Sequence, residues 1–187
     1  MADTATRRRP TVPAAEWLEA LSPATRIAFY GGAAARTAAA AVWGPEFSAA
    51  VCRAHASGAR ATLWMGPDEY LLLEVGSNPS AATAAETVAA LERALAGIPH
   101  ALVDVSHRQF ALQVSGPHAA TILSGACPLD LDPSEFPVGM CTRTVLAKAD
   151  IVLWRTRELA FHLEVWRSFA GYVTGVLGEI AAEFYPG

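Results

Sequence analysis

The stretch VDVSHRQFALQVSGPHAA, residues 103–120, decides the fold. Apolar and polar residues alternate over residues 100–105 and again over residues 108–114, which is the pattern of two half-buried strands. Gly116 and Pro117 follow as a strand-to-helix junction, because proline suits the first turn of a helix. The predicted order of strand, strand and short helix is the beginning of a unit that occurs twice in this chain.

The duplication is visible in two pairs of segments. LWMGPDEYLLLEV, residues 63–75, and LWRTRELAFHLEV, residues 153–165, align without a gap at an offset of 90 (153 minus 63). Each has a polar turn between apolar flanks, which predicts a hairpin. Upstream, residues 27–35 and 112–120 correspond at an offset of 85 (112 minus 27), each with a strand, a glycine turn and an alanine-rich helix start. Matches in the same order favour a duplicated unit.

A helix is predicted after each hairpin. The first starts near residues 78–80, where Asn-Pro-Ser is a start signal, and ends by Gly97. The second covers residues 168–184, with apolar residues on one side. Each unit then reads β-β-α-β-β-β-α, although the opening strand of the first is unclear, since residues 17–23 look like a docked turn or a short helix. The expected fold is α+β, with antiparallel-rich sheets and helices on one face.

The expected domain organisation follows from these units. Residues 1–22 form an N-terminal arm that we expect to be partly disordered, since it holds the basic run at residues 7–9 in a polar context. Residues 23–187 form a single compact domain of two pseudo-repeats, at about 24–97 and 100–185.

Composition excludes several classes of protein. The chain has 187 residues, of which 52% are hydrophobic, so it can bury a substantial core. A formal net charge of −4 gives no general attraction to nucleic acid. No apolar run approaches the roughly 20 residues that span a bilayer, so we expect no membrane segment. We expect a cytoplasmic protein.

The cysteines support a reducing compartment. Cys52, Cys127 and Cys141 are odd in number and scattered, which argues against a disulfide framework. A zinc site from Cys127, Cys141 and His118 is disfavoured, because no Cys-x-x-Cys or His-x-x-x-His spacing occurs. Buried free thiols are the favoured interpretation.

A catalytic triad from Asp104, Ser106 and His107 is also disfavoured. Alternation along a strand puts Asp104 and Ser106 on one face and His107 on the other. The chain also lacks a Gly-x-Ser-x-Gly nucleophile elbow. We expect residues 106–108 to form a hairpin turn instead.

A partner surface is predicted from tryptophan and arginine. A small domain rarely needs five tryptophans for its own core, and tryptophan is enriched at interfaces, although core packing stays open for each. A basic patch on the second half could contact an acidic partner, with a solvated strand face as the favoured alternative; its members are Arg143, Lys148, Arg155, Arg157 and Arg167. The candidate interface residues are Trp17, Trp43, Trp64, Trp154, Trp166, Arg143 and Arg167.

Five motifs together identify a relative. They are LWMGPDEYLL at residues 63–72, DVSHR at 104–108, VSGPHAA at 114–120, CPLDL at 127–131 and RSFAGY at 167–172. From about residue 26 to residue 185, the chain resembles the gamma subunit of heterotetrameric sarcosine oxidase. That family is related in fold to the folate-binding domain of the glycine-cleavage T-protein, a duplicated β-β-α-β-β-β-α unit.

The resemblance implies a non-catalytic gamma subunit with a role in assembly and stability. Its partners would be the alpha, beta and delta subunits of a complex that oxidatively demethylates sarcosine to glycine and transfers the one-carbon unit to tetrahydrofolate. FAD, FMN, NAD, tetrahydrofolate and zinc are implied for the partner subunits, and no catalytic, cofactor-binding or metal residue is implied for this chain. A free-standing folate-binding or aminomethyltransferase-like protein of the same fold is the alternative. An isolated subunit is expected to self-associate or to expose a large apolar patch.

Overall fold

The computed structural model describes residues 15–22, 24–75 and 81–185. The strands are β1 (Leu18–Ala20), β2 (Thr25–Gly31), β3 (Ala54–Ser57), β4 (Arg60–Gly66), β5 (Glu69–Glu74), β6 (His100–Asp104), β7 (Gln109–Ser115), β8 (Cys141–Leu146), β9 (Ala149–Arg157) and β10 (Ala160–Trp166). The helices are α1 (Ala33–Trp43), α2 (Ala81–Ala94), α3 (Ala119–Ser124) and α4 (Ala170–Ala181), with a 3-10 turn, η1 (Arg167–Phe169), before α4.

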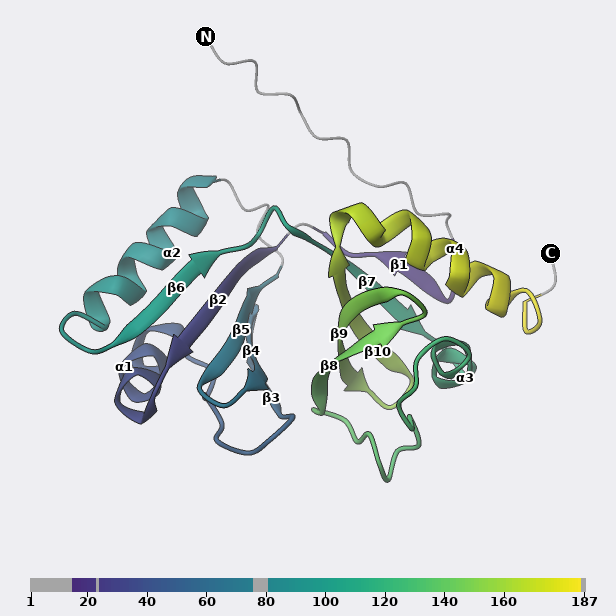
Figure 1. Cartoon of the computed structure of the whole chain (residues 1–187), viewed down its shortest axis with the longest axis horizontal. Coiled ribbons are helices and arrows are strands. Elements are labelled where there is room, and N and C mark those ends of the chain that lie inside the picture. Colours follow the sequence, from purple (N-terminus) through teal and green to yellow (C-terminus); the bar gives the residue numbers. More distant parts are fainter. Residues whose placement is uncertain (1–14, 23, 76–80, 186–187) are drawn as a thin grey trace, which may run out of the picture.

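The strands form two sheets of five, and every pair is antiparallel. Sheet A has the order β1-β7-β10-β9-β8, and sheet B has the order β3-β4-β5-β2-β6. Helices α1 and α2 cover the outer face of sheet B, α3 and α4 cover the outer face of sheet A, and the inner faces meet (Figure 1). This confirms the α+β fold with helices on one face of each sheet.

Three apolar clusters match these layers. Phe29 on β2 and Leu91 on α2 belong to the cluster under the helices of sheet B, and Leu163 on β10 and Leu177 on α4 belong to the one under the helices of sheet A. The third cluster lies between the sheets and includes Leu63 on β4. Because inner-face and outer-face side chains alternate along a strand, both faces of the central strands are buried.

The element order repeats as β-β-α-β-β-β-α, as expected of the duplication, but the two opening strands are exchanged between the sheets. Strand β1 pairs with β7 of the second unit, and β6 pairs with β2 of the first, where Ile27 faces Asp104. The expectation of a turn or short helix over residues 17–23 is therefore wrong for β1, which also lies inside the expected N-terminal arm. The expected disorder of the arm, with the arginines at residues 7–9, concerns residues outside those described.

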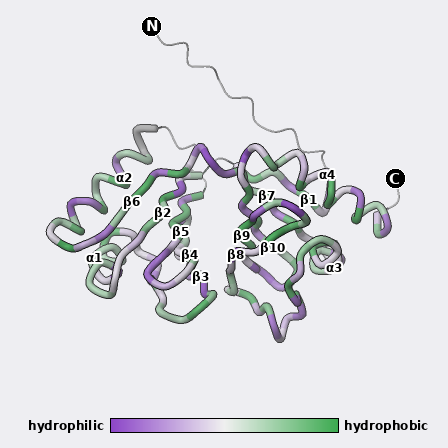
Figure 2. The backbone as a smooth tube through the Cα atoms, viewed as in Figure 1, coloured by the Kyte–Doolittle hydropathy of each residue, from purple (hydrophilic) through white to green (hydrophobic). Residues whose placement is uncertain are grey.

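The exchange also changes the role of residues 106–108. They form a turn, as expected, but it carries the chain from sheet B to sheet A, so it does not close a hairpin. In Figure 2 hydrophilic residues follow β6 where the chain crosses between the two halves. The two pseudo-repeats are therefore not separate sheets, because each sheet contains one strand of the other repeat.

The two hairpins are related by a different offset from the one that their sequences indicate. Gly66 pairs with Glu69 at the turn of β4 and β5, and Arg157 pairs with Ala160 at the turn of β9 and β10. The structural offset is therefore 91 (157 minus 66), one residue more than the ungapped alignment. A slip of one residue exchanges the faces of a strand, and Leu63 indeed faces the inter-sheet cluster whereas Leu153 faces the helices.

Both long helices occur where they were predicted, with shorter bounds. The start signal at residues 78–80 lies outside the described residues. Over η1 and α4 the expected apolar side is only partly buried: Val173 and Leu177 are buried, whereas Phe169 in η1 and Tyr172 in α4 are 43% and 40% exposed. None of the described helices has the length and apolar character needed to cross a bilayer.

Candidate functional site

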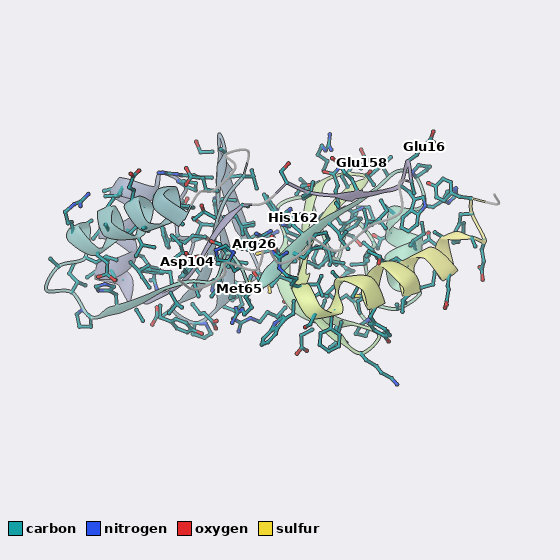
Figure 3. The ribbon with its side chains drawn as sticks, turned by 90° about the horizontal axis from the view of Figure 1, so that it is seen from above. Glu16, Arg26, Met65, Asp104, Glu158 and His162 are labelled. Carbon is teal, nitrogen blue, oxygen red and sulfur yellow. The ribbon has the colours of Figure 1, made fainter. Side chains whose placement is uncertain are left out.

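A charged cluster is buried where the inner faces of the two sheets meet. The Arg26 Nε of β2 donates to Glu164 Oε2 of β10 at 2.7 Å, and the His162 ring Nε2 lies 2.8 Å from Glu164 Oε1. Arg26 is 2% exposed and Glu164 is 0% exposed. Figure 3 shows Arg26 and His162 between the two halves, near Met65. The pair joins one sheet to the other.

The ionised form of Glu164 is stabilised in this position. Burial raises the pKa of its carboxyl, but the Arg26 charge and the hydrogen bonds from His162 and Arg26 outweigh burial and leave the pKa below its ordinary value of 4.5. Glu164 is therefore held as a carboxylate, and it would be left with one hydrogen-bonding partner if Arg26 were removed.

A cleft of about 460 Å³ opens between the sheets beside this cluster. Strands β2, β4, β5 and β6 line it on one side, and β7 to β10 line it on the other. Met65, Val103 and Val105 supply apolar lining, and Glu164 reaches it from the buried cluster. Its size is that of a small-ligand pocket, and it lies where the two repeats meet.

A polar clamp closes one part of the cleft. Tyr30 Oη of β2 donates to Glu69 Oε1 of β5 at 2.6 Å, and the Arg143 guanidinium of β8 donates to both oxygens of Glu69. The hydrogen bond to Glu69 raises the pKa of the Tyr30 hydroxyl. Burial raises the pKa of Glu69, yet the hydrogen bonds from Arg143 and Tyr30 leave it lowered. Arg143 thus connects the sheets and is not free for an external carboxylate.

Beside the polar clamp, Arg108 and Gln109 in the lining of the cleft have side-chain groups without a hydrogen-bonding partner among the described residues. The Arg108 guanidinium lies over the Trp166 ring at 5.2 Å from its centroid. Next to Arg108, the Gln109 side chain is 7% exposed, and its Oε1 has no hydrogen-bond donor among the described residues. All three residues line the cleft.

The lining of the cleft shows which chemical groups an occupant would meet. Its lining residues, all within the described part of the chain, include no serine, cysteine or histidine, so no hydroxyl or thiol meets an imidazole there. Charged side chains, a tryptophan face and an unsatisfied carboxamide oxygen are what the cleft offers to an occupant.

The disfavoured triad is a turn in the structure. Ser106 donates from its backbone N–H and from Oγ to Asp104 Oδ1, at 2.9 and 2.5 Å, and Ser106 Oγ accepts from the Arg26 backbone N–H at 2.9 Å. His107 is exposed in the same turn, and its carbonyl accepts from Arg167 Nε. The serine and aspartate therefore support the crossover between the sheets.

Two of the candidate interface tryptophans are core residues. Trp17 is 8% exposed and stacks on Tyr185, with ring centroids 6.3 Å apart. Trp43 is 1% exposed and ends α1 under the Arg60 guanidinium. Their side chains complete the two outer clusters, so the core-packing alternative holds for Trp17 and Trp43, and any contact of theirs with a partner stays a prediction.

The other three tryptophans differ in their surroundings: Trp64 packs under the helices of sheet B, Trp154 packs between the sheets, and Trp166 lines the cleft. Trp64 and Trp154 are half-buried in β4 and β9 and pack against apolar clusters. Trp166 is 48% exposed at the end of β10. Of the predicted residues, the structure brings Arg143 and Trp166 together in the lining of the cleft. Their contact with a partner stays a prediction.

One member of the predicted basic patch, Arg155, is buried rather than at the surface. Arg155 is 3% exposed, and its Nη1 donates to the carbonyls of Leu131 and Phe136, so it anchors the loop at residues 130–139. A solvated face is therefore wrong for Arg155. Its burial is explained by the unpaired carbonyls of a loop that contains two prolines.

The thiols are free and mostly buried, as favoured from the sequence. Cys127 and Cys141 are buried and Cys52 is half-buried. Burial raises the pKa of the Cys141 thiol to about 12. The described residues contain no group of three metal-ligating side chains.

Sequence reasoning missed the Arg26–Glu164 pair and the cleft. A signal existed, because Arg26 and Glu164 are charged residues inside otherwise apolar strands. Their partnership could not be read from local pattern, since 138 residues separate them.

Comparison with known proteins identifies the family. Residues 30–183 match the model of the "Sarcosine oxidase, gamma subunit family". The sarcosine oxidase subunit gamma of Corynebacterium sp. (strain P-1) is 36% identical over 124 residues, which are 66% of this chain and 58% of that protein. The Arthrobacter sp. sarcosine oxidase subunit gamma is 37% identical over 110 residues, 59% of this chain and 51% of that one. The matches thus span little more than half the length of these relatives.

Solved structures agree on the fold. The heterotetrameric sarcosine oxidase from Corynebacterium sp. U-96, in complex with pyrrole 2-carboxylate, contains a chain that matches with a TM-score of 0.81 and 30% identity, over 94% of this chain and 90% of that chain. The glycine cleavage system aminomethyltransferase T from Bartonella henselae matches with a TM-score of 0.61 and 17% identity, over 86% of this chain and 44% of that chain, so it shares the fold. From the family match over most of its length, the chain belongs to the sarcosine oxidase gamma subunit family.

Proposed function

We propose that this chain is the gamma subunit of a heterotetrameric sarcosine oxidase and acts in assembly and stability rather than in bond making. The observation that carries the proposal is the match, over 94% of the chain, to a chain of a heterotetrameric sarcosine oxidase. The cleft between the sheets supports a binding role, since it offers side chains for recognition and no nucleophile–imidazole pair within its described lining.

We further propose that the partners are alpha, beta and delta subunits, and that they hold FAD, FMN, NAD, tetrahydrofolate and zinc. The complex would demethylate sarcosine oxidatively to glycine and transfer the one-carbon unit to tetrahydrofolate. A cytoplasmic location is proposed from the free thiols, because disulfides are rare in that compartment.

The test is co-expression of this chain, with an affinity tag, together with the three candidate partner chains from the same host. Capture through the tag is expected to recover all four chains in equal amounts, with flavin absorbance and sarcosine-dependent oxygen uptake. The same capture from cells that express this chain alone should give neither signal. Recovery of this chain by itself when all four are present would contradict the proposal, and tight folate binding by that isolated chain would favour the free-standing alternative.

A further inference from the structure

We propose that the cleft between the two sheets is a docking site for an extended, acidic segment of a partner subunit. The segment would place a carboxylate on Arg108 and a backbone N–H on Gln109. This inference rests on the proposed function, because it names the surface through which the subunit would join its complex.

The orphaned oxygen of Gln109 indicates that the cleft is incomplete in the isolated chain. A buried carbonyl without a donor costs roughly 1–3 kcal/mol, so such groups are rare in folded proteins and usually have a partner. Gln109 is 7% exposed, its Oε1 is buried without a donor among the described residues, and the residue lines a cleft that is large enough to admit an occupant. An occupant of the cleft that brings an N–H or O–H donor to Gln109 would satisfy this oxygen.

The charges of the cleft indicate an acidic group beside that donor. The carboxylates of Glu69 and Glu164 are neutralised by Arg143 and Arg26. By contrast, Arg108 forms no ion pair within residues 15–22, 24–75 and 81–185 and has only the Trp166 ring beneath it. A guanidinium that contacts an aromatic ring and forms no ion pair can still donate its N–H groups to a carboxylate, which they match in geometry.

The lining has one further carboxylate, that of Asp150 on β9, which also forms no ion pair within the described chain. An occupant must therefore present donors as well as an acceptor. The backbone of an extended peptide has N–H groups along its length and can meet Gln109 and Asp150 while a side-chain carboxylate meets Arg108.

Exposed residues in and near the lining of the cleft favour a protein over a small molecule. Trp166 in the lining is 48% exposed, and further along the chain Phe169 and Tyr172 are 43% and 40% exposed, with their ring centroids 6.4 Å apart. On the opposite side of the cleft, Tyr30 and Val103 are 46% and 53% exposed. A small molecule inside the cleft would leave most of this rim in water, whereas tryptophan, tyrosine and arginine at the centre of a protein interface dominate its binding energy.

The experiment measures how well variant chains compete with the wild-type chain for incorporation into the complex. Wild-type and variant chains with different tags are co-expressed with the candidate partner subunits, and the ratio of the two tags in the purified complex is measured. Arg108→Glu reverses the charge that meets the carboxylate, and Gln109→Leu removes the carbonyl that needs a donor. Each is expected to enter the complex about tenfold less than the wild type, as for a central interface residue.

Matched controls lie away from the cleft. Arg93→Glu makes the same charge reversal in the last turn of α2, and Val51→Ser changes an apolar residue that is 65% exposed. Both should enter the complex within about twofold of the wild type, because rim or remote substitutions change little.

The stability of each isolated variant separates loss of docking from loss of folding. Gln109→Leu should fold as stably as the wild type or more stably, since it removes an unsatisfied buried oxygen, and still compete poorly. Equal incorporation of both cleft variants into a complex that the wild type does enter would refute the docking site and leave the proposed function standing. A wild-type chain that enters no complex would overturn both, and a small organic compound found in the cleft of the isolated chain by native mass spectrometry would show a different occupant.

Discussion

Replacement of Arg26 by Met would leave Glu164 as a buried carboxylate without its counter-ion. Glu164 is 0% exposed. Its Oε2 would lose the 2.7 Å hydrogen bond from Arg26, whereas its Oε1 would keep the hydrogen bond with His162. Breaking one side of a buried ion pair costs about 3–5 kcal/mol. Since a domain of this kind has a net stability of about 5–15 kcal/mol, Arg26→Met should remove a large part of it.

The assay is urea unfolding of the isolated chain, followed by circular dichroism. With a urea slope of about 2 kcal/mol per molar, the midpoint should fall by roughly 1.5–2.5 M. Arg36→Met is the matched control, because its ion pair with Asp68 is at the surface, where the aspartate side chain is 59% exposed, and such pairs contribute about 0–1 kcal/mol.

The double variant Arg26→Met/Glu164→Leu separates loss of the pair from loss of one partner. Replacing both charges by apolar groups leaves no uncompensated carboxylate, so its stability should return to near that of the wild type or above it. If Arg26→Met costs less than about 1 kcal/mol, or the double variant is no more stable than the single one, the buried pair does not hold the sheets together as argued.

The pair also predicts how stability depends on pH. The folded-state pKa of Glu164 is lowered from its ordinary value of 4.5, so its contribution is fully present above the unfolded pKa and is lost as pH falls through the folded pKa. Below about pH 4.5 the wild type should lose stability more steeply than the Arg26→Met/Glu164→Leu variant, as measured by urea midpoints at about pH 7 and pH 3.5. Parallel curves for the two proteins would contradict the assignment.

Two further predictions concern single positions. At about pH 8 an aromatic disulfide reagent should label the half-buried Cys52 quickly and leave Cys141 unlabelled until urea unfolds the chain. The reason is that burial raises the pKa of the Cys141 thiol to about 12. Rapid labelling that persists in a Cys52→Ser variant would contradict this prediction. Gly31→Ala should destabilise by about 1–3 kcal/mol, since a Cβ there would lie 2.6 Å from that of Ala35, whereas Gly175→Ala on the open face of α4 should stabilise by about 0.5–1 kcal/mol in the same urea assay.

Local sequence pattern was sufficient to predict helices, hairpins and turns wherever the interactions that form them join residues close in sequence. The hairpin around Asp68, the turn at Gly116 and the buried positions Leu91 and Leu95 of α2 were all predictable, because alternation, turn chemistry and helical spacing depend on neighbouring residues. The same reasoning disfavoured a triad at the turn that follows β6, and the hydrogen bonds of that turn are structural.

Local sequence pattern did not predict the strand register or the sheet to which each opening strand belongs. The ungapped match of Leu63 with Leu153 joined residues that face opposite sides of their sheets, because two apolar faces make a one-residue slip invisible in the sequence. A strand of three residues such as β1 carries too little pattern to reveal that it pairs with β7 of the other repeat.

The sequence by itself determined the family, the repeated β-β-α-β-β-β-α order and, apart from β1, most of the segments that become helices and strands. Only the tertiary structure decided that the opening strands are exchanged, that Arg26 meets Glu164, and that Arg108, Gln109 and Trp166 border one cleft. The physical reason is that strand pairing and buried charge pairing join residues across most of the chain, and the free energy that selects those partners arises only when the two sheets pack face to face.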